Sequence, residues 1–144
     1  MTTTALDGQI RDGAHYMQVR IYFEDTDAGR IVYHANYLRF MERGRTNYLR
    51  VLGTDQGALL DGASDFAFVV RSMQIEFHKP AFLDDVLEIV TAPEQVRGAS
   101  LILNQRCQRG GDLVAEARVR VAFVSAGKAQ RIPRALRASL GGSL

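Results

Sequence analysis

The segment EDTDAGRIVYHANYLRFMERGR occupies residues 24–45 and carries the strongest structural signals in the chain. Its turn formers at 25–29 end a strand. Beyond them apolar residues recur at three- and four-residue spacing, and Asn36 as N-cap and Gly53 as stop predict one long helix over 36–52. Two carboxylates and a histidine therefore precede or begin a helix N-terminus, whose amides stabilise developing negative charge. An acyl-transfer oxyanion needs that environment.

The stretches on either side of this helix have the period of strands. Residues 16–24 alternate, which predicts a half-buried strand whose inner face is made by Met17, Val19, Ile21 and Phe23. After a loop or short helix at 54–65, four further strands are expected at 66–78, 85–96, 99–109 and 112–125. Gly98 and the Gly110-Gly111 pair supply hairpin turns between the last three. We expect at most one short helical turn after Pro133.

One strand, one long helix and four meandering antiparallel strands predict an α+β domain. A curved antiparallel sheet of about five strands must wrap the helix, because neither element has another partner to cover its apolar face. Gly44, on the inner stripe of the helix, lets the helix backbone approach the sheet closely. In the strand over 66–78 the alternation predicts an inner face of Val69, Arg71, Met73, Ile75 and Phe77, with Phe68 opposed to it. The last strand predicts an unbroken inner face of Leu113, Ala115, Ala117, Val119, Val121 and Phe123.

The outer side of the sheet is not fully polar. We expect a second subunit to cover part of it. The apolar residues predicted on that side are Val70, Val86, Val90, Val114 and Val124.

Length and composition predict a single domain with a single core and with disorder confined to its ends. The chain has 144 residues, 47% hydrophobic and 24% charged. Its formal charge of +2 argues against nucleic-acid binding. One cysteine, Cys107, permits no intrachain disulfide, and we detect no secretory signal or membrane-spanning run, so a cytoplasmic location is expected. Basic residues gather in the C-terminal half, at Arg97, Arg106, Arg109, Arg118, Arg120, Lys128, Arg131, Arg134 and Arg137.

The segment DTDAGRIVYHANYLRFMERGR resembles the signature of hot-dog-fold thioesterases. The resemblance is to the 4-hydroxybenzoyl-CoA thioesterase-like group and, more closely, to the acyl-CoA thioesterases associated with the Tol-Pal system. It extends through RSMQIEFHKPAFLDDVLEIVT at 71–91, RGASL at 97–101 and RIPRAL at 131–136. It implies a hot-dog fold over 16–137, hydrolysis of acyl-CoA to free coenzyme A and a carboxylic acid, and a homodimer or homotetramer. Coenzyme A enters as part of the substrate, and no separate cofactor is implied.

The same resemblance assigns roles to particular residues. The catalytic carboxylate falls on Asp27, as nucleophile or as general base for water. His34 holds the position whose backbone N–H faces the thioester carbonyl, and its imidazole is also available to substrate. Tyr22 and Tyr33 are candidate pocket residues. The coenzyme A phosphates are expected to bind near the turn that holds Arg97 and Ser100. Gly98 and Ala99 stand where the hydroxybenzoyl-CoA enzyme carries additional basic residues. We therefore expect Lys128, Arg131 or Arg134 to contribute to phosphate binding.

Other readings of these residues stay open. Asp27 is also a common turn-capping residue type. A dehydratase or hydratase would use Glu42 with His34, and a non-catalytic module would bind acyl-CoA or a membrane-associated partner. A calcium loop is excluded because Arg30 stands where glycine is required, and the histidines lack metal-ligand spacing. We expect short to medium aliphatic acyl chains carried by coenzyme A, with aromatic acyl groups or acyl carrier protein as alternatives.

Overall fold

The computed structural model describes residues 5–52 and 66–141. The predicted helix stop at Gly53, the predicted loop or short helix over 54–65 and the outermost ends of the chain lie outside these ranges. No helix in the described part is both long and apolar enough to span a membrane.

The described elements follow the predicted order, with short additions at both ends. The long elements are β2 (Ala14–Arg20), α1 (His34–Leu52), β3 (Phe66–Phe77), β4 (Val86–Val96), β5 (Ser100–Arg109) and β6 (Asp112–Ser125). The additions are η1 (Ala5–Asp7), β1 (Gln9–Arg11), η2 (Phe23–Asp25) and β7 (Lys128–Ala129). The short helix expected after Pro133 is α3 (Arg134–Ser139), as predicted.

The strands in the described ranges form one antiparallel sheet in the order β1-β2-β4-β5-β6-β3, with β7 on β6. The predicted hairpins between β4, β5 and β6 are confirmed. The prediction that all four later strands form a meander was wrong for β3. This strand lies at the far edge of the sheet and pairs with β6 rather than β4. The segment after β3 crosses the end of the sheet instead, since His78 N–H donates to Val114 O and Asp84 N–H donates to Ile21 O.

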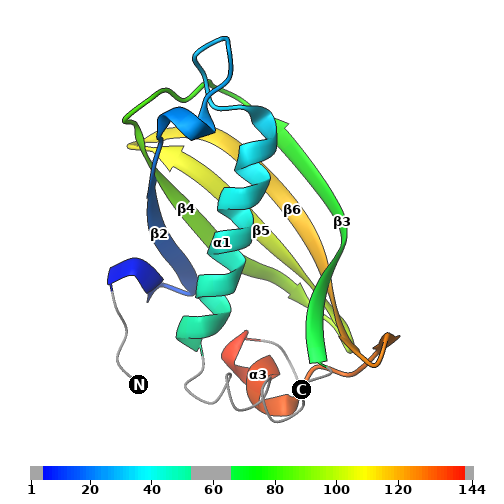
Figure 1. Cartoon of the computed structure of the whole chain (residues 1–144). Coiled ribbons are helices and arrows are strands. Elements are labelled where there is room, and N and C mark those ends of the chain that lie inside the picture. The colour runs from blue at the N-terminus through cyan, green and yellow to red at the C-terminus, as the bar shows by residue number, and fades with distance from the viewer. Residues whose placement is uncertain (1–4, 53–65, 142–144) are drawn as a thin grey trace.

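Helix α1 lies across the concave face of the sheet (Figure 1). Its buried stripe packs mainly on β4 and β2. The helix can press against the strands because Gly44 has no side chain: a Cβ there would meet Thr91 Oγ1 at 2.9 Å and Ile89 Cγ2 at 3.0 Å. The predicted role of Gly44 is confirmed. The buried residues of the helix are Asn36, Tyr37, Phe40, Met41, Gly44 and Tyr48.

A β-bulge overturns the predicted faces of β3. The register with β6 shifts at Arg71. On one side of the shift Phe68 lies opposite buried Phe123, and on the other Met73 lies opposite buried Val119. Strict alternation does not reveal an inserted residue, which is why the prediction that Phe68 and Val70 oppose Met73 was wrong. The inner face is made by Phe68, Val70, Met73, Ile75 and Phe77.

Two further departures have local causes. Phe23 is 78% exposed, not buried, because β2 ends at Arg20 and the chain turns into η2. Val114 is fully buried because a second bulge, opposite Cys107 and Gln108, inserts it into β6. Val90 is also buried. Of the predicted outer set, Val86 is exposed and Val124 is half-buried.

Candidate active site

The loop between η2 and α1 holds the residues on which the predicted chemistry depends. It folds back on itself through a bridge between Thr26 and Val32. Val32 N–H donates to Ala81 O, and Tyr33 N–H donates to Asp25 O, both at 2.9 Å. These bonds fasten the loop to the crossing segment and to the start of the helix. The loop is therefore built from backbone bonds, at the end of the molecule where α1 begins (Figure 1).

The two acids of the DTD motif have different environments. Asp25 Oδ2 accepts a hydrogen bond from Tyr22 N–H at 2.8 Å, which closes η2. Asp27 Oδ1 accepts one from Gly29 N–H at 2.8 Å, and Asp27 is exposed in the single chain. Within the described residues, Asp27 Oδ2 has no hydrogen-bond partner. Asp27 thus performs the turn-capping role and still keeps one oxygen free to act on a substrate.

Helix α1 begins at His34, two residues before the predicted N-cap. Asn36 lies inside the first turn, so its prediction as N-cap was wrong. Its carboxamide instead donates to Asp25 O at 2.9 Å, and its N–H donates to Tyr33 O at 2.8 Å. The first amides of a helix have no acceptor within the helix. The N–H groups of His34 and Ala35 are therefore the ones that this end of the helix can offer to an anion.

The imidazole of His34 lies on the surface between two aromatic rings. Its ring centre is 4.6 Å from that of Tyr33 and 6.0 Å from that of Phe77, which meets it edge-on. Phe77 also contacts Tyr37 at 5.7 Å. Phe77, at the end of β3, was not singled out from the sequence, where it reads as one more inner-face residue. Its contact with His34 depends on how β3 and α1 meet in space.

The two candidate tyrosines lie on different parts of the surface. Tyr33 is 47% exposed and stacks beside His34. Tyr22 is 56% exposed and borders a surface hollow of about 510 Å³ with Phe23 and Leu83. Glu42, the acid of the dehydratase reading, follows His34 by eight residues, which is about 12 Å along a helix axis. It accepts a hydrogen bond from Thr46 instead. Glu42 and His34 of one chain therefore do not converge.

Arg97 and Ser100 lie at the opposite end of the fold. Arg97 N–H donates to Ser100 O at 2.8 Å and closes the turn between β4 and β5. The buried guanidinium of Arg137 donates to Arg97 O at 2.8 Å and to Gly98 O at 2.7 Å. Arg131 also approaches this turn, since its Nη1 lies 3.6 Å from where a Cβ on Gly98 would be.

The described residues show no metal centre. Within 5–52 and 66–141, no three His, Cys, Asp or Glu side chains converge to hold an ion. The loop that carries Asp27 leads directly into α1, where the rings of Tyr33 and Phe77 flank His34.

A family model described as the thioesterase-like superfamily matches residues 21–140. The chain belongs to the thioesterase-like superfamily. Among its relatives, the acyl-CoA thioesterase YbgC of Haemophilus influenzae is 44% identical over 117 residues, covering 81% of this chain and 85% of that protein. The acyl-CoA thioester hydrolase YbgC of Escherichia coli is 48% identical over 123 residues, covering 85% and 89%.

Solved structures of the superfamily have the same fold. A probable thioesterase from Bartonella henselae superposes with a TM-score of 0.74 at 36% identity, covering 85% of this chain and all of that one. A mutant 4-hydroxybenzoyl CoA thioesterase complexed with 4-hydroxybenzoyl CoA superposes with a TM-score of 0.80 at 25% identity, covering 89% and 99%. The predicted hot-dog fold, a helix wrapped by a curved antiparallel sheet, is confirmed.

Proposed function

We propose that this protein hydrolyses acyl-CoA thioesters and that Asp27 supplies the catalytic carboxylate. The hydrolase activity is supported by thioesterase relatives at 44% and 48% identity over most of the chain. The observation that supports Asp27 is the difference between the two acids of the loop. Asp25 is engaged with Tyr22 N–H, whereas Asp27 keeps Oδ2 available in the loop that leads into α1.

The proposed reaction uses the loop and the helix together. The thioester carbonyl oxygen accepts a hydrogen bond from His34 N–H, so charge that develops on this oxygen is stabilised by the helix terminus. Asp27, held by Gly29 N–H, either attacks the carbonyl carbon or takes a proton from the attacking water. The carbon–sulfur bond breaks, the thiolate of coenzyme A leaves and is protonated, and water supplies the oxygen of the carboxylic acid.

We further propose that the substrate spans two subunits. In one chain the loop before α1, which holds Asp27, and the turn between β4 and β5, which holds Arg97, lie at opposite ends of the fold (Figure 1). The 19-residue helix α1, about 28 Å long, extends between these ends. An oligomer brings the phosphate-binding turn of one subunit near the loop of another. Among the described strands, β3 pairs only with β6. Its free edge is long and carries exposed apolar side chains, which favours pairing with a second copy.

The phosphate end of coenzyme A is proposed to bind at Arg97 and Ser100. Arg131 adds a second guanidinium over Gly98 and supplies the charge that this turn lacks. None of the ion pairs between described residues involves Arg97 or Arg131, so both charges are available to an anion.

The test is steady-state kinetics with acetyl-, butyryl-, octanoyl- and dodecanoyl-CoA, following release of the free thiol with a thiol-reactive dye. Asp27→Asn keeps the size of the side chain and removes its charge, so kcat should fall at least about 100-fold, in the range of acid–base catalysis. The matched control is Asp12→Asn, an exposed aspartate in the turn between β1 and β2. Turnover of Asp27→Asn within threefold of the control would exclude Asp27 as the catalytic group.

A further inference from the structure

A cavity of about 430 Å³ lies beneath α3, at the end of the fold away from the loop that holds Asp27 (Figure 1). Its wall is made by the C-terminal end of α1, the turn between β1 and β2, the bulged part of β4 and the end of α3. We name it the α3 cavity. The side chains that line it include Ile10, Tyr48, Leu52, Pro93, Val96 and Leu140.

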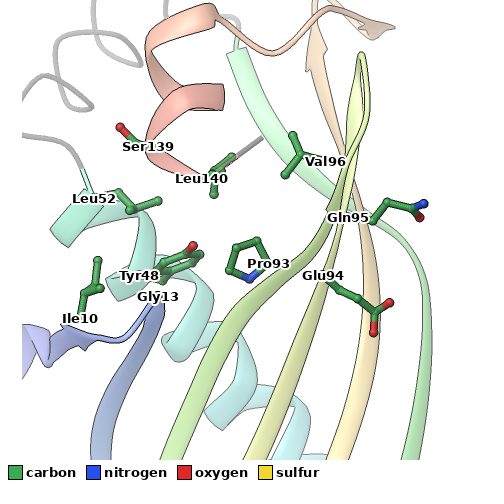
Figure 2. A pocket seen from close by; sticks show the side chains of 11 residues that line it. Ile10, Gly13, Tyr48, Leu52, Pro93, Glu94, Gln95, Val96, Ser139 and Leu140 are labelled. Atoms are coloured by element: carbon green, nitrogen blue, oxygen red, sulfur yellow. The ribbon is translucent and has the colours of Figure 1, made fainter. Parts of the chain in front are cut away.

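The hydroxyl of Tyr48 is a buried polar group in this cavity. Tyr48 is 2% exposed, and Figure 2 shows its phenol oxygen pointing toward Pro93, into the α3 cavity. No described residue forms a hydrogen bond with this hydroxyl. Burial raises the pKa of Tyr48 to about 12, so the hydroxyl keeps its proton at neutral pH. A buried hydroxyl without a partner has lost its hydrogen bonds to water, and a ligand that bonds to it recovers that loss.

The ring of Tyr48 also borders a smaller cavity of about 230 Å³ between α1 and strands β3, β5 and β6. A change at Tyr48 therefore affects the walls of both spaces. Leu52 lines the α3 cavity and does not line the smaller one. A ligand in the α3 cavity is thus distinguished from one in the smaller cavity by its dependence on Leu52.

The α3 cavity lacks a free charge to balance a charged ligand. Among the described residues that line it, Glu94 is the one charged side chain, and its carboxylate accepts a hydrogen bond from Arg118 Nε at 2.8 Å. Figure 2 shows Glu94 pointing away from Tyr48. Ser139 Oγ donates to Ala135 O at 3.1 Å. Since burying a charge without a partner is costly, these contacts favour a neutral ligand.

The side chains around the hydroxyl define the rest of the ligand. Leu52, Pro93 and Leu140 place hydrocarbon groups around Tyr48 (Figure 2). The volume of the cavity lies in the range of small-molecule sites, which combine apolar contact with a few polar groups that fix orientation. The matching ligand has a hydrocarbon body and one acceptor oxygen, such as that of a ketone, an ester or an alcohol.

Helix α3 connects this cavity to the turn between β4 and β5. Leu140, at the end of α3, lines the cavity, and Arg137, three residues earlier, donates to Arg97 O and Gly98 O. A ligand that contacts Leu140 stabilises the position of α3 in which these two bonds are made, because a ligand favours the state that it contacts. Coupling between two sites is reciprocal, so whatever binds at the turn also favours the ligand in the cavity.

We propose that the α3 cavity is a regulatory site for a neutral compound with a hydrocarbon body and one acceptor oxygen, to which Tyr48 donates a hydrogen bond. The bound compound holds α3, and through Arg137 the turn with Arg97, in the arrangement that receives the phosphates of coenzyme A. Binding of the compound is independent of the proposed thioesterase function. Its effect on the affinity for acyl-CoA rests on that function.

The first experiment compares three probes that share one hydrocarbon ring: cyclohexyl methyl ketone, cyclohexanecarboxylate and cyclohexylmethylamine. Binding to the full chain is measured by isothermal titration calorimetry. The neutral ketone should bind once per chain, and the anion and the cation at least about tenfold more weakly, because neither charge finds a partner in the cavity. If water alone occupies the cavity and the ketone does not bind, the proposal is overturned. Equal affinity for the ketone and the carboxylate overturns it as well.

Two variants assign the ketone to the α3 cavity. Leu52→Trp fills the cavity and should abolish binding, and the matched control is Val51→Trp, at a neighbouring half-buried residue that does not line it. Tyr48→Phe removes only the hydroxyl and should weaken ketone binding about fivefold. Because that hydroxyl has no partner among the described residues, Tyr48→Phe should unfold within 2 °C of the unmodified protein. Ketone binding that is unchanged in both Leu52→Trp and Tyr48→Phe rules out this site.

The second experiment tests the coupling to the turn. With saturating ketone, KM for octanoyl-CoA should fall at least about twofold at unchanged kcat, in the unmodified protein and in Val51→Trp but not in Leu52→Trp. A KM that ignores the bound ketone refutes the coupling through Arg137. A chain that binds the ketone but hydrolyses no acyl-CoA refutes the thioesterase function and supports the binding site, so the two failures are distinguishable.

Discussion

The contact between α1 and the sheet predicts a large effect for Gly44→Ala. A Cβ at this position would lie 2.9 Å from Thr91 Oγ1, 3.0 Å from Ile89 Cγ2 and 3.1 Å from Gln105 Nε2. All three neighbours are fully buried, so none can move aside freely. Overpacking of this kind costs about 1–3 kcal/mol.

Two further contributions decide the size of the effect. Moving Gln105 weakens its hydrogen bonds to Met41 O and Thr91 Oγ1, and a buried donor left without a partner costs about 1–3 kcal/mol. Alanine recovers about 1 kcal/mol of helix propensity over glycine. The net expectation is that the free energy of unfolding falls by about 3 kcal/mol, from the midpoints of these ranges.

Thermal unfolding followed by circular dichroism measures this change. A loss of about 3 kcal/mol lowers Tm by roughly 10 °C in a domain of this size. Protein concentration must be held constant because any association of folded copies would stabilise them by mass action. The control is Gly111→Ala, where no atom lies within 4 Å of the added Cβ. A Gly44→Ala Tm within 2 °C of the control would show that the helix does not depend on this close approach.

Three other predictions concern buried groups. Burial lowers the pKa of His15 from its ordinary 6.5, so the unfolded chain binds a proton that the folded chain excludes. The free energy of unfolding should therefore fall as the pH drops below 6.5. Urea titrations from pH 7.5 to 5 should show a smaller decline for His15→Asn. Burial raises the pKa of Cys107 to about 12, so the native protein should bind no thiol-reactive dye and the denatured chain one equivalent per subunit. Arg137→Met leaves the carbonyls of Arg97 and Gly98 without their donor, so Tm should fall and KM for acyl-CoA should rise. An unchanged KM would show that Arg137 does not contribute to substrate binding at the turn between β4 and β5.

Local sequence signals identified most of the elements. The alternation in β2 and β6, the helical period of α1 and the glycines at the hairpins are all properties of neighbouring residues, and the structure has each of these elements. The loop at 25–33 was also recognisable, because a strand end followed by turn formers and a helix start occupies a continuous stretch. The roles assigned there to Asp27 and His34 stay predictions until the variants are measured.

The predicted inner and outer faces were wrong where an inserted residue or an early strand end breaks the alternation. The bulge at Arg71 moves Phe68 and Val70 to the inner face, and it is visible only in the pairing with β6. The early end of β2 exposes Phe23 for a similar reason, since η2 depends on the bond between Asp25 and Tyr22 N–H.

By itself the sequence determined the elements, the concave packing of the helix and the loop that holds the candidate acid, because each depends on residues a few positions apart. The tertiary structure alone decided that β3 lies at the free edge, that the loop and the Arg97 turn occupy opposite ends, and that Tyr48 lines two cavities. These features depend on strand order and register, which are set by contacts between segments distant in the chain.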